Sequence, residues 1–356
     1  MTGGGTGGHV VPNLAVIAEL KKMALKQGFS LDLLYVGAEN GMEKAMVEKE
    51  KIEYRGVSCG KLRRYFSWEN FQDFFKIPKG IFQAYKILGK FQPEVVFSKG
   101  GFVSFPVIVA AYFRRIPTII HESDVVPGLA NRLCFFFAKN IFLSFDESLK
   151  YIKKKWHKKV TITGPIVRTD ISDGDAKNAL KLTKFDHYRP VILAMGGSLG
   201  AQQINELIWN SLPELTKRYQ IAHITGKGHL NFGFQQRGYK QFEYLGAELK
   251  DLYAIADLVI TRGGANSLSE IEYLQKKALV IPLGTEVSRG DQIVNAQVFC
   301  RRNGWSLLQG DISVQEFIES VELAIKNNLT HDNPETSQRG VILIAARILK
   351  TNSAIL

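Results

Sequence analysis

Short apolar segments alternate with longer amphipathic stretches along both halves of the chain. Each apolar segment has the length of a strand, and those in the second half are followed by a glycine-bearing turn or a helical pattern. This alternation is typical of β-α units on a parallel sheet, so it predicts an α/β fold in each half. The apolar segments are residues 31–37, 94–97, 117–121, 140–145 and 160–164, then 191–195, 221–225, 258–261 and 279–283.

The length of 356 residues predicts about two domains. We expect an N-terminal domain over residues 1–165, a polar linker over 166–188 and a second domain over 189–338. A C-terminal helix over 339–356 is expected to pack back towards the first domain. The glycine-rich segments at 2–8 and 195–201 each lead into a helical pattern, which suggests two related folds that face one cleft.

The first glycine-rich turn begins almost at the start of the chain. Such a turn normally follows a buried strand, yet only Met1 precedes Thr2. We therefore expect the first domain to lack its opening strand, either because the start was assigned too late or because the chain is truncated. A real truncation would weaken this domain by removing a central strand.

Composition indicates a globular protein with anionic partners. Hydrophobic residues make up 45% of the chain and charged residues 22%, and the net charge of +12 favours nucleic acid, anionic lipid or phosphorylated substrates without choosing among them. Cys59, Cys134 and Cys300 lack metal-ligand spacing, which fits a reducing cytoplasm. No signal peptide and no apolar run near the ~20 residues of a membrane span is present, so we expect peripheral membrane contact at most.

Three glycine-rich turns are candidates for binding phosphate. Residues 3–8, 98–106 and 196–200 place successive glycines before a helical pattern, where backbone N–H groups can approach an anion. None has the Lys-Ser/Thr of a P-loop, and neither 3–8 nor 196–200 matches the dinucleotide fingerprint. Each alone is most simply a structural turn, but three in one chain favour an anion site over nucleotide hydrolysis or dinucleotide binding.

Six motifs in fixed order resemble the MurG family of cell-wall glycosyltransferases over nearly the whole chain. They are TGGGTGGH, SKGGFVSFP, HESDVVPGLAN, GGSLGA, TRGGANSLSE and GDQIVNA. The resemblance implies a GT-B fold, with two Rossmann-like, doubly wound domains facing an interdomain cleft. It also implies transfer of N-acetylglucosamine from UDP-N-acetylglucosamine to an undecaprenyl-diphosphate-linked muramyl peptide at the cytoplasmic face of the cell membrane.

The resemblance places the donor site in the second domain. In this reading Ser198 binds a donor phosphate, and Glu270 binds the ribose hydroxyls, although a glutamate at this helical position would otherwise be a solvated one. Arg168 adds positive charge near the diphosphate, Leu245 lines the uracil pocket, and Gln292 binds the sugar hydroxyls. The backbone N–H groups that suit the UDP diphosphate are those of Ala265, Asn266 and Ser267 at a helix start.

The acceptor site is implied for the first domain, at Thr6, Gly7, Gly8 and His9. A helix N-terminus disfavours the cationic form of a histidine, so His9 either accepts the proton of the attacking hydroxyl or positions acceptor phosphate. Asp124, where the family often has asparagine, is a second candidate for catalysis and sugar contact. The implied chemistry is inversion by direct displacement, and no Asp-x-Asp pair is present, so we expect no cofactor and no obligatory protein-bound metal.

A basic aromatic stripe follows between residues 61 and 90. Seven Lys or Arg side chains are interleaved there with aromatic residues, a pattern typical of contact with an anionic bilayer, although part of it must be ordinary core. Substituting serine at Phe71, Phe74 and Phe75 is expected to reduce liposome binding more than UDP binding. The lysines between residues 150 and 159 either extend this surface or form a solvated loop.

Two other functions remain open at the level of sequence. A UDP-N-acetylglucosamine epimerase could share the architecture and donor site, but it would not need the basic aromatic stripe. A non-enzymatic polyanion-binding protein fits the net charge but not three phosphate-type turns, so we expect no nucleic-acid partner. Dinucleotide oxidoreduction is weaker because the fingerprint is absent.

Overall fold

The structure is a computed structural model that describes residues 1–60, 68–197, 200–284, 290–327 and 335–353, without the side chains of 68–75, 335–339 and 351–353. The chain forms two compact units. Unit 1 comprises Met1–Val167 and Thr336–Leu356, and unit 2 comprises Arg168–Glu335. Both units are α/β with wholly parallel strand pairs, so the predicted fold class is confirmed.

The elements of unit 1 alternate along the chain from its start, and α12 adds a last helix to it. They are α1 (Gly7–Gln27), β1 (Leu34–Ala38), α2 (Glu43–Lys49), β2 (Glu53–Val57), α3 (Trp68–Phe91), β3 (Val96–Ser98), α4 (Ser104–Phe113), β4 (Thr118–Glu122), α5 (Leu129–Cys134), β5 (Asn140–Leu143), the 3-10 helices η1 (Asp146–Tyr151) and η2 (Lys154–Lys159), β6 (Val160–Ile162) and α12 (Glu335–Ser353).

The elements of unit 2 repeat the same alternation. They are the 3-10 helix η3 (Thr169–Ser172), α6 (Ala176–Thr183), β7 (Val191–Met195), α7 (Gln202–Leu215), β8 (Gln220–Ile224), β9 (Tyr239–Phe242), α8 (Leu249–Ile255), β10 (Leu258–Thr261), α9 (Ala265–Tyr273), β11 (Lys277–Val280), α10 (Asp291–Asn303), β12 (Ser306–Leu307) and α11 (Val314–Lys326).

The start of the chain lies in the middle of the unit 1 sheet. The strands form a pair, β1-β2, and a row, β3-β4-β5-β6. Thr2 bridges Val36 of β1 and Ser98 of β3 in parallel, and the Met1 ammonium donates to the Leu34 carbonyl oxygen at 2.8 Å. Met1 and Thr2 therefore lie between β1 and β3, at the position of the central strand that the first domain was expected to lack.

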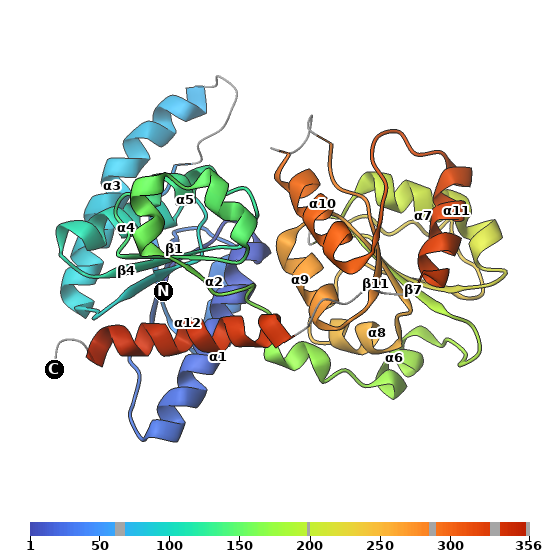
Figure 1. Cartoon of the computed structure of the whole chain (residues 1–356), viewed down its shortest axis with the longest axis horizontal. Helices are drawn as coiled ribbons and strands as arrows, with labels where there is room; N and C mark the ends of the chain where they lie inside the picture. Colours follow the sequence, from blue (N-terminus) through green and yellow to red (C-terminus); the bar gives the residue numbers. More distant parts are fainter. Residues whose placement is uncertain (61–67, 198–199, 285–289, 328–334, 354–356) are drawn as a thin grey trace. The chain divides into compact units, whose positions relative to one another are not determined.

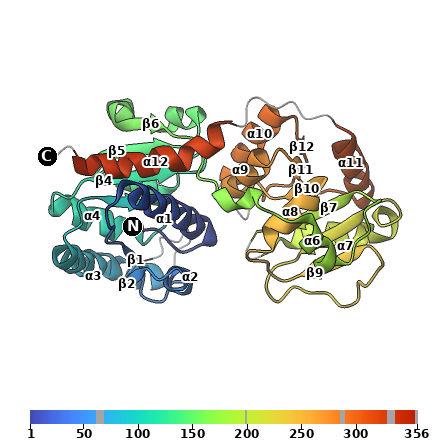
Figure 2. The ribbon, with the colours of Figure 1, turned by 90° about the horizontal axis from the view of Figure 1, so that it is seen from below.

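The strands of unit 1 bury side chains on both faces. One face packs against α3, α4 and α5, and the other against α1, α2 and α12. Phe97, Ile119 and Phe142 meet Val16 and Leu20 of α1 there, and α12 adds Val341, Ile344, Ala345 and Ile348. The last helix thus runs beside α1 across the sheet, as both views show (Figures 1 and 2).

Unit 2 has the strand order of a doubly wound nucleotide-binding fold. Its sheet runs β12-β11-β10-β7-β8-β9, so the chain starts in the centre, moves out to β9 and returns through β10 to the other edge. Helices α7 and α11 cover one face, and α8 and α9 contact β7 and β10 while α10 packs beside α9 (Figure 1). This order places loops from adjacent strands together at the carboxyl edge of the sheet.

Residues 168–188, which are most of the linker expected over 166–188, fold as part of unit 2. Helix α6 packs on α8, and a Cβ on Gly174 would overlap the carbonyl oxygen of Lys250. The Asp175 N–H donates to Asp251 Oδ1 at 2.8 Å. The segment is polar because one side of its helix is exposed to solvent. Composition alone does not distinguish such a packed helix from a linker.

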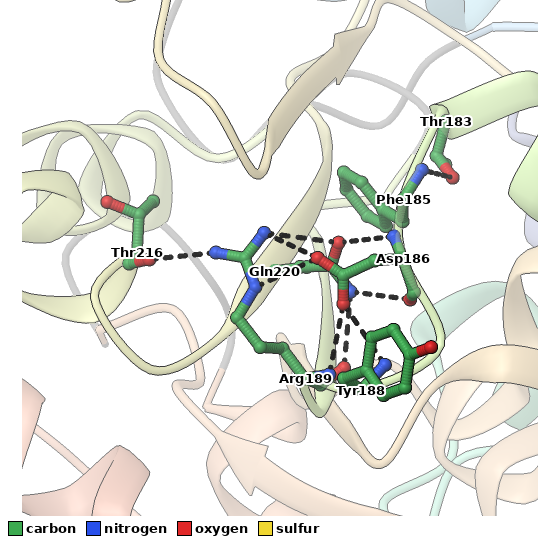
Figure 3. Close-up of polar contacts among 7 residues, drawn as sticks. All are labelled: Thr183, Phe185, Asp186, Tyr188, Arg189, Thr216 and Gln220. Carbon is green, nitrogen blue, oxygen red and sulfur yellow. Dashed lines mark hydrogen bonds and ion pairs between the residues drawn. The ribbon is translucent and has the colours of Figure 1, made fainter.

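An ion-pair cluster fixes the entry into β7 (Figure 3). Arg189 Nη2 donates to Asp186 Oδ2 at 2.8 Å and Arg189 Nη1 donates to the Thr216 carbonyl oxygen at 3.1 Å. The Asp186 N–H also donates to Gln220 Oε1 at 2.8 Å. The hydrogen bond from the Arg189 guanidinium holds the pKa of Asp186 below its usual range. This cluster lies at the amino ends of β7 and β8, opposite the edge where ligands bind, so we assign it a structural role.

Candidate functional site

The predicted donor residues of unit 2 follow neighbouring parallel strands. Leu245 lies in the loop after β9, Ala265 to Glu270 lie in α9 after β10, and Gln292 lies at the start of α10 after β11. Ser198 follows β7 but lies outside the described residues. Since carboxyl ends of parallel strands meet at one edge, the sheet gathers these loops at the position where open α/β sheets bind nucleotides.

The glycines after β7 allow other loops to approach closely. A Cβ on Gly200 would overlap the carbonyl oxygen of Thr225, in the loop after β8, and Gly200 has a φ of +76° that favours glycine. A Cβ on Gly197 would lie 3.1 Å from Arg262 Nη2. Glycine at these positions therefore brings the β8 loop and a guanidinium from the β10 loop against the candidate phosphate turn.

Helix α9 begins directly at this edge. Its first backbone hydrogen bond runs from the Leu268 N–H to the Gly264 carbonyl oxygen, so Ala265, Asn266 and Ser267 form the first turn. Backbone N–H groups in a first helical turn lack intrahelical acceptors, and the helix dipole adds partial positive charge there. The predicted location of these three residues is therefore suitable for a diphosphate.

Glu270 lies one turn into α9, between a cation and a phenol. Arg168 Nε lies 3.5 Å from Glu270 Oε1, and the Tyr253 hydroxyl donates to the Glu270 carboxylate. Burial raises the pKa of Glu270, and Arg168 opposes that rise. The structure thus places Arg168 beside the predicted ribose-binding carboxylate, where the pair fixes the position of Glu270 rather than leaving it solvated.

Gln292 is held against the same segment. Its Oε1 accepts from the Leu283 N–H at 3.4 Å, and Asn295 Nδ2 donates to the Gly263 carbonyl oxygen at 3.1 Å. A Cβ on Gly263 would overlap the carbonyl oxygen of Gln292. The start of α10 and the start of α9 are therefore packed together through a glycine.

Two glycine turns of unit 1 interlock in a similar way. A Cβ on Gly101, whose φ is +88°, would overlap the carbonyl oxygen of Gly4. Beyond this contact, Gly5 and Gly7 have no atom within 4 Å of an added Cβ, and Thr6 and Gly8 are exposed. The first turn is therefore packed on one side and accessible on the other, beside the start of α1.

His9 lies at the start of α1 with its ring partly buried. Its Nδ1 donates to the Lys99 carbonyl oxygen at 3.2 Å, because a carbonyl can only accept, and the neutral ring then carries its lone pair on Nε2. Burial and the Lys99 ammonium lower the pKa of His9 from 6.5 to about 4. Near neutral pH the imidazole is therefore unprotonated and can accept a proton.

Asp124 lies in a loop that Glu122 organises. Glu122 Oε1 accepts from the Asp124 N–H at 3.0 Å, and Glu122 Oε2 accepts from the Gly128 N–H at 3.0 Å and from Asn131 Nδ2 at 2.9 Å. The structure brings Asp124, at the end of β4, and Lys99, at the end of β3, to the edge of the sheet that also holds the first glycine turn.

Several residues at these edges were not identified from the sequence. Tyr253 and Arg262 in unit 2, and Lys99 and Asn131 in unit 1, act through neighbours that are distant in the chain. A polar side chain that directly follows an apolar strand, or that faces one, is the sequence feature that could have indicated these residues. Within the described ranges, no three His, Cys, Asp or Glu side chains gather closely enough to hold a metal ion.

Comparison with known proteins identifies the family. Residues 1–143 match the glycosyltransferase family 28 N-terminal domain, and residues 191–348 match the C-terminal domain of that family. A Bacillus anthracis UDP-N-acetylglucosamine--N-acetylmuramyl-(pentapeptide) pyrophosphoryl-undecaprenol N-acetylglucosamine transferase is 46% identical over 329 residues, which are 92% of this chain and 91% of that protein.

Solved structures share the fold at lower identity. The crystal structure of Acinetobacter baumannii MurG has a TM-score of 0.69 at 22% identity and covers 98% of both chains. A Neisseria meningitidis UDP-GlcNAc 2-epimerase bound to UDP-GlcNAc has a TM-score of 0.64 at 16% identity and covers 97% of this chain and 98% of its own. The fold is thus common to transferases and epimerases, and the sequence identity separates them: the chain belongs to glycosyltransferase family 28 and, within it, to the MurG family that its motifs resemble.

Proposed function

We propose that this protein transfers N-acetylglucosamine from UDP-N-acetylglucosamine to the muramyl sugar of an undecaprenyl-diphosphate-linked muramyl peptide, with inversion. The observation that carries the proposal is the 46% identity to a transferase of that name across 92% of the chain. The positions of the polar residues at the carboxyl edges of both units support it.

In unit 2, the donor is bound at the edge formed by the loops after β7 to β11. The first turn of α9 donates its N–H groups to the UDP diphosphate, and Glu270 accepts from the ribose hydroxyls. Gln292 binds the sugar hydroxyls, Leu245 lines the uracil pocket, and Ser198 binds a phosphate. Arg262, which lies beside Gly197, supplies positive charge to the leaving diphosphate, while Arg168 holds Glu270.

In unit 1, His9 acts as the general base and Asp124 contacts the acceptor sugar. The acceptor oxygen forms a bond to the anomeric carbon as the bond from that carbon to the UDP oxygen breaks. The hydroxyl proton passes to His9 Nε2, and Thr6, Gly7 and Gly8 place N–H groups near acceptor phosphate. The low pKa of His9, about 4, keeps the ring able to accept that proton near neutral pH.

The acceptor is lipid-linked, so the protein works as a peripheral protein at the cytoplasmic membrane surface. Phe71, Phe74 and Phe75 of the predicted stripe have side chains outside the described residues. A described set of rings at the end of α4 and after α5 supports the same role, and we call it the aromatic patch: Tyr112, Phe113, Phe136 and Phe137. Among the described residues, no helix has the length and apolarity that crossing a bilayer requires.

The aromatic patch continues onto α3 through basic side chains. The Arg114 guanidinium lies 3.8 Å from the centre of the Tyr85 ring, and Lys86 Nζ lies 4.5 Å from that of Phe82. Exposed rings bordered by arginine and lysine are suited to a bilayer surface with anionic head groups.

Radiolabelled UDP-N-acetylglucosamine and the lipid-linked acceptor test the reaction. Label that moves into the lipid fraction supports the transferase, whereas free altered sugar without lipid label supports the epimerase and contradicts the proposal.

The Glu270→Gln variant should bind UDP at least about tenfold more weakly, because hydrogen bonds to a charged group contribute about 1.5–3 kcal/mol. Glu319→Gln on the exposed side of α11 is the control and should bind UDP normally.

A further inference from the structure

Lys99 is a buried cation that touches two loops of the acceptor side. It follows β3 in the second glycine turn, and its side chain is only 2% exposed. Its ammonium donates to Ser123 Oγ in the loop after β4, and its carbonyl oxygen accepts from His9 Nδ1. One residue therefore connects the start of α1 with the loop that carries Asp124.

The burial of this ammonium is not explained by a close ion pair. Within the described part of the chain, no carboxylate oxygen lies within 4 Å of Lys99 Nζ. The Glu122 carboxylate instead binds Asn131 and the backbone of its own loop, and Glu122 and Asp124 act on Lys99 only at longer range. Burying a charge without a close partner destabilises a fold, so its presence at a site edge indicates a function.

The charge of Lys99 acts on the histidines that surround it. Burial lowers the pKa of Lys99, and Glu122 and Asp124 oppose that change and favour the ammonium. Burial lowers the pKa of His9 on α1 and of His121 at the end of β4, and the ammonium of Lys99 lowers both further. Glu43 on α2, the other carboxylate near the first glycine turn, is bound to the N–H groups of Gly5 and Ala38.

We propose that Lys99 is a positioning residue for the transfer reaction: its ammonium anchors the Ser123–Asp124 segment against β3, and its carbonyl oxygen orients the His9 ring. This inference rests on the proposed role of His9 as the base. It separates two effects of Lys99: the hydrogen bond to Ser123 helps to position Asp124, and the positive charge adds to burial in disfavouring the cationic form of His9.

Two substitutions separate the hydrogen bond from the charge. Lys99→Gln removes the charge and keeps an amide that can donate to Ser123, whereas Ser123→Ala keeps the charge and removes the anchor. Lys26→Met, at the exposed end of α1, is the matched control. For each variant, kcat and KM for the lipid-linked acceptor are measured across pH, and the His9 pKa is followed by NMR of labelled imidazole nitrogens.

Lys99→Gln should raise the His9 pKa from about 4 by about one pH unit, because burial still lowers it, and should move the acid limb of kcat/KM upward by the same amount. Ser123→Ala should lower kcat about tenfold with the acid limb unmoved, and Lys26→Met should change neither. An unchanged His9 pKa in Lys99→Gln, or an unchanged kcat in Ser123→Ala, overturns the inference. If Lys99→Gln fails to fold, the Ser123→Ala result still decides whether the anchor matters.

Failure of the proposed function gives a different result. A His9→Gln variant that retains full transfer removes His9 from the role of base. In that case the NMR shift of His9 in Lys99→Gln still reports whether the Lys99 charge acts on the ring. Titration of every variant with UDP measures ligand binding by unit 2, and the affinity for UDP should remain unchanged.

Discussion

Gly263 and Gly264 are neighbours with opposite surroundings. A Cβ on Gly263 would overlap the carbonyl oxygen of Gln292, whereas a Cβ on Gly264 meets no atom within 4 Å. The first glycine is therefore required for the contact between α9 and α10, and the second is not required for packing. Gln292 and Ala265, which are predicted to bind the donor, lie on either side of this contact.

The two glycines give a matched pair of substitutions. Gly263→Ala should destabilise unit 2 by about 1–3 kcal/mol and weaken UDP binding, because α10 must move to admit the methyl group. Gly264→Ala should cost less than about 1 kcal/mol, which is the usual loss at a helix N-cap. Thermal unfolding with and without UDP measures both effects. Equal melting temperatures for the two variants would show that the contact is not tight.

At the residue scale, motif order predicted that Ala265 to Ser267 begin a helix and that Glu270 follows one turn later, and the structure confirms these positions because they depend on local helix geometry. It did not identify Tyr253, whose hydroxyl reaches Glu270 from α8, or Arg262, whose guanidinium approaches Gly197 across the sheet edge. These roles depend on tertiary distances, which spacing in one sequence does not contain.

At the scale of elements, a buried polar network joins α7 to β8 and β9. His223 Nε2 donates to Asn205 Oδ1 at 3.0 Å, and His223 Nδ1 lies 2.9 Å from the Tyr239 hydroxyl, which also accepts from Trp209 Nε1. Each ring nitrogen of His223 has a hydrogen-bond partner when the ring is neutral, so the neutral form is suited to this site. Burial lowers the pKa of His223 from 6.5 to about 3.

This network makes the stability of unit 2 sensitive to acid. Between pH 6.5 and about pH 3 the unfolded chain binds a proton at His223 that the folded protein excludes, so stability is full above pH 6.5 and falls as the pH drops through that window. At about pH 4.5 the loss should be about 2–3 kcal/mol.

Calorimetry at neutral pH and at about pH 4.5 measures that loss, with the unit 2 transition identified by its shift on addition of UDP. In His223→Gln the difference between the two pH values should shrink by about the same 2–3 kcal/mol, whereas exposed His229→Gln should behave as the wild type. A His223→Gln variant with an undiminished pH dependence would exclude His223 as its cause.

The sequence predicted the central strands and the edge strand β6, but it missed three other edge strands. Strands β7 and β10 begin and end where the apolar segments do, because both faces of a central parallel strand are buried. Strands β2, β9 and β12 were not predicted: β2 and β9 contain Glu53, Arg55 and Lys240, and β12 has only two residues. Strands at an edge are exposed on one side and therefore lack a continuous apolar run.

At the scale of the whole molecule, the aromatic patch supplies a test of membrane contact. Phe113 is 66% exposed and Phe136 is 55% exposed, so their joint replacement by serine removes apolar surface without opening the core. Binding to vesicles that contain anionic lipid should weaken at least about tenfold, from the loss of about 1.5 kcal/mol or more.

Phe232 provides the control for this test, because it is 74% exposed and belongs to unit 2. Phe232→Ser should bind vesicles as the wild type does, and all variants should bind UDP equally. If Phe232→Ser weakens vesicle binding as much as the double variant, the attraction is a general effect of exposed rings and the aromatic patch is not a membrane face.

Helix α5 joins the loop after β4 to the aromatic patch over a very short span. Asn131 on this helix binds Glu122, and Phe136 follows five residues later, two residues past the end of α5. Five residues of chain span at most about 18 Å, even when they are fully extended. In the proposed function, an acceptor sugar held at that loop therefore lies close to the rings that are expected to contact the bilayer.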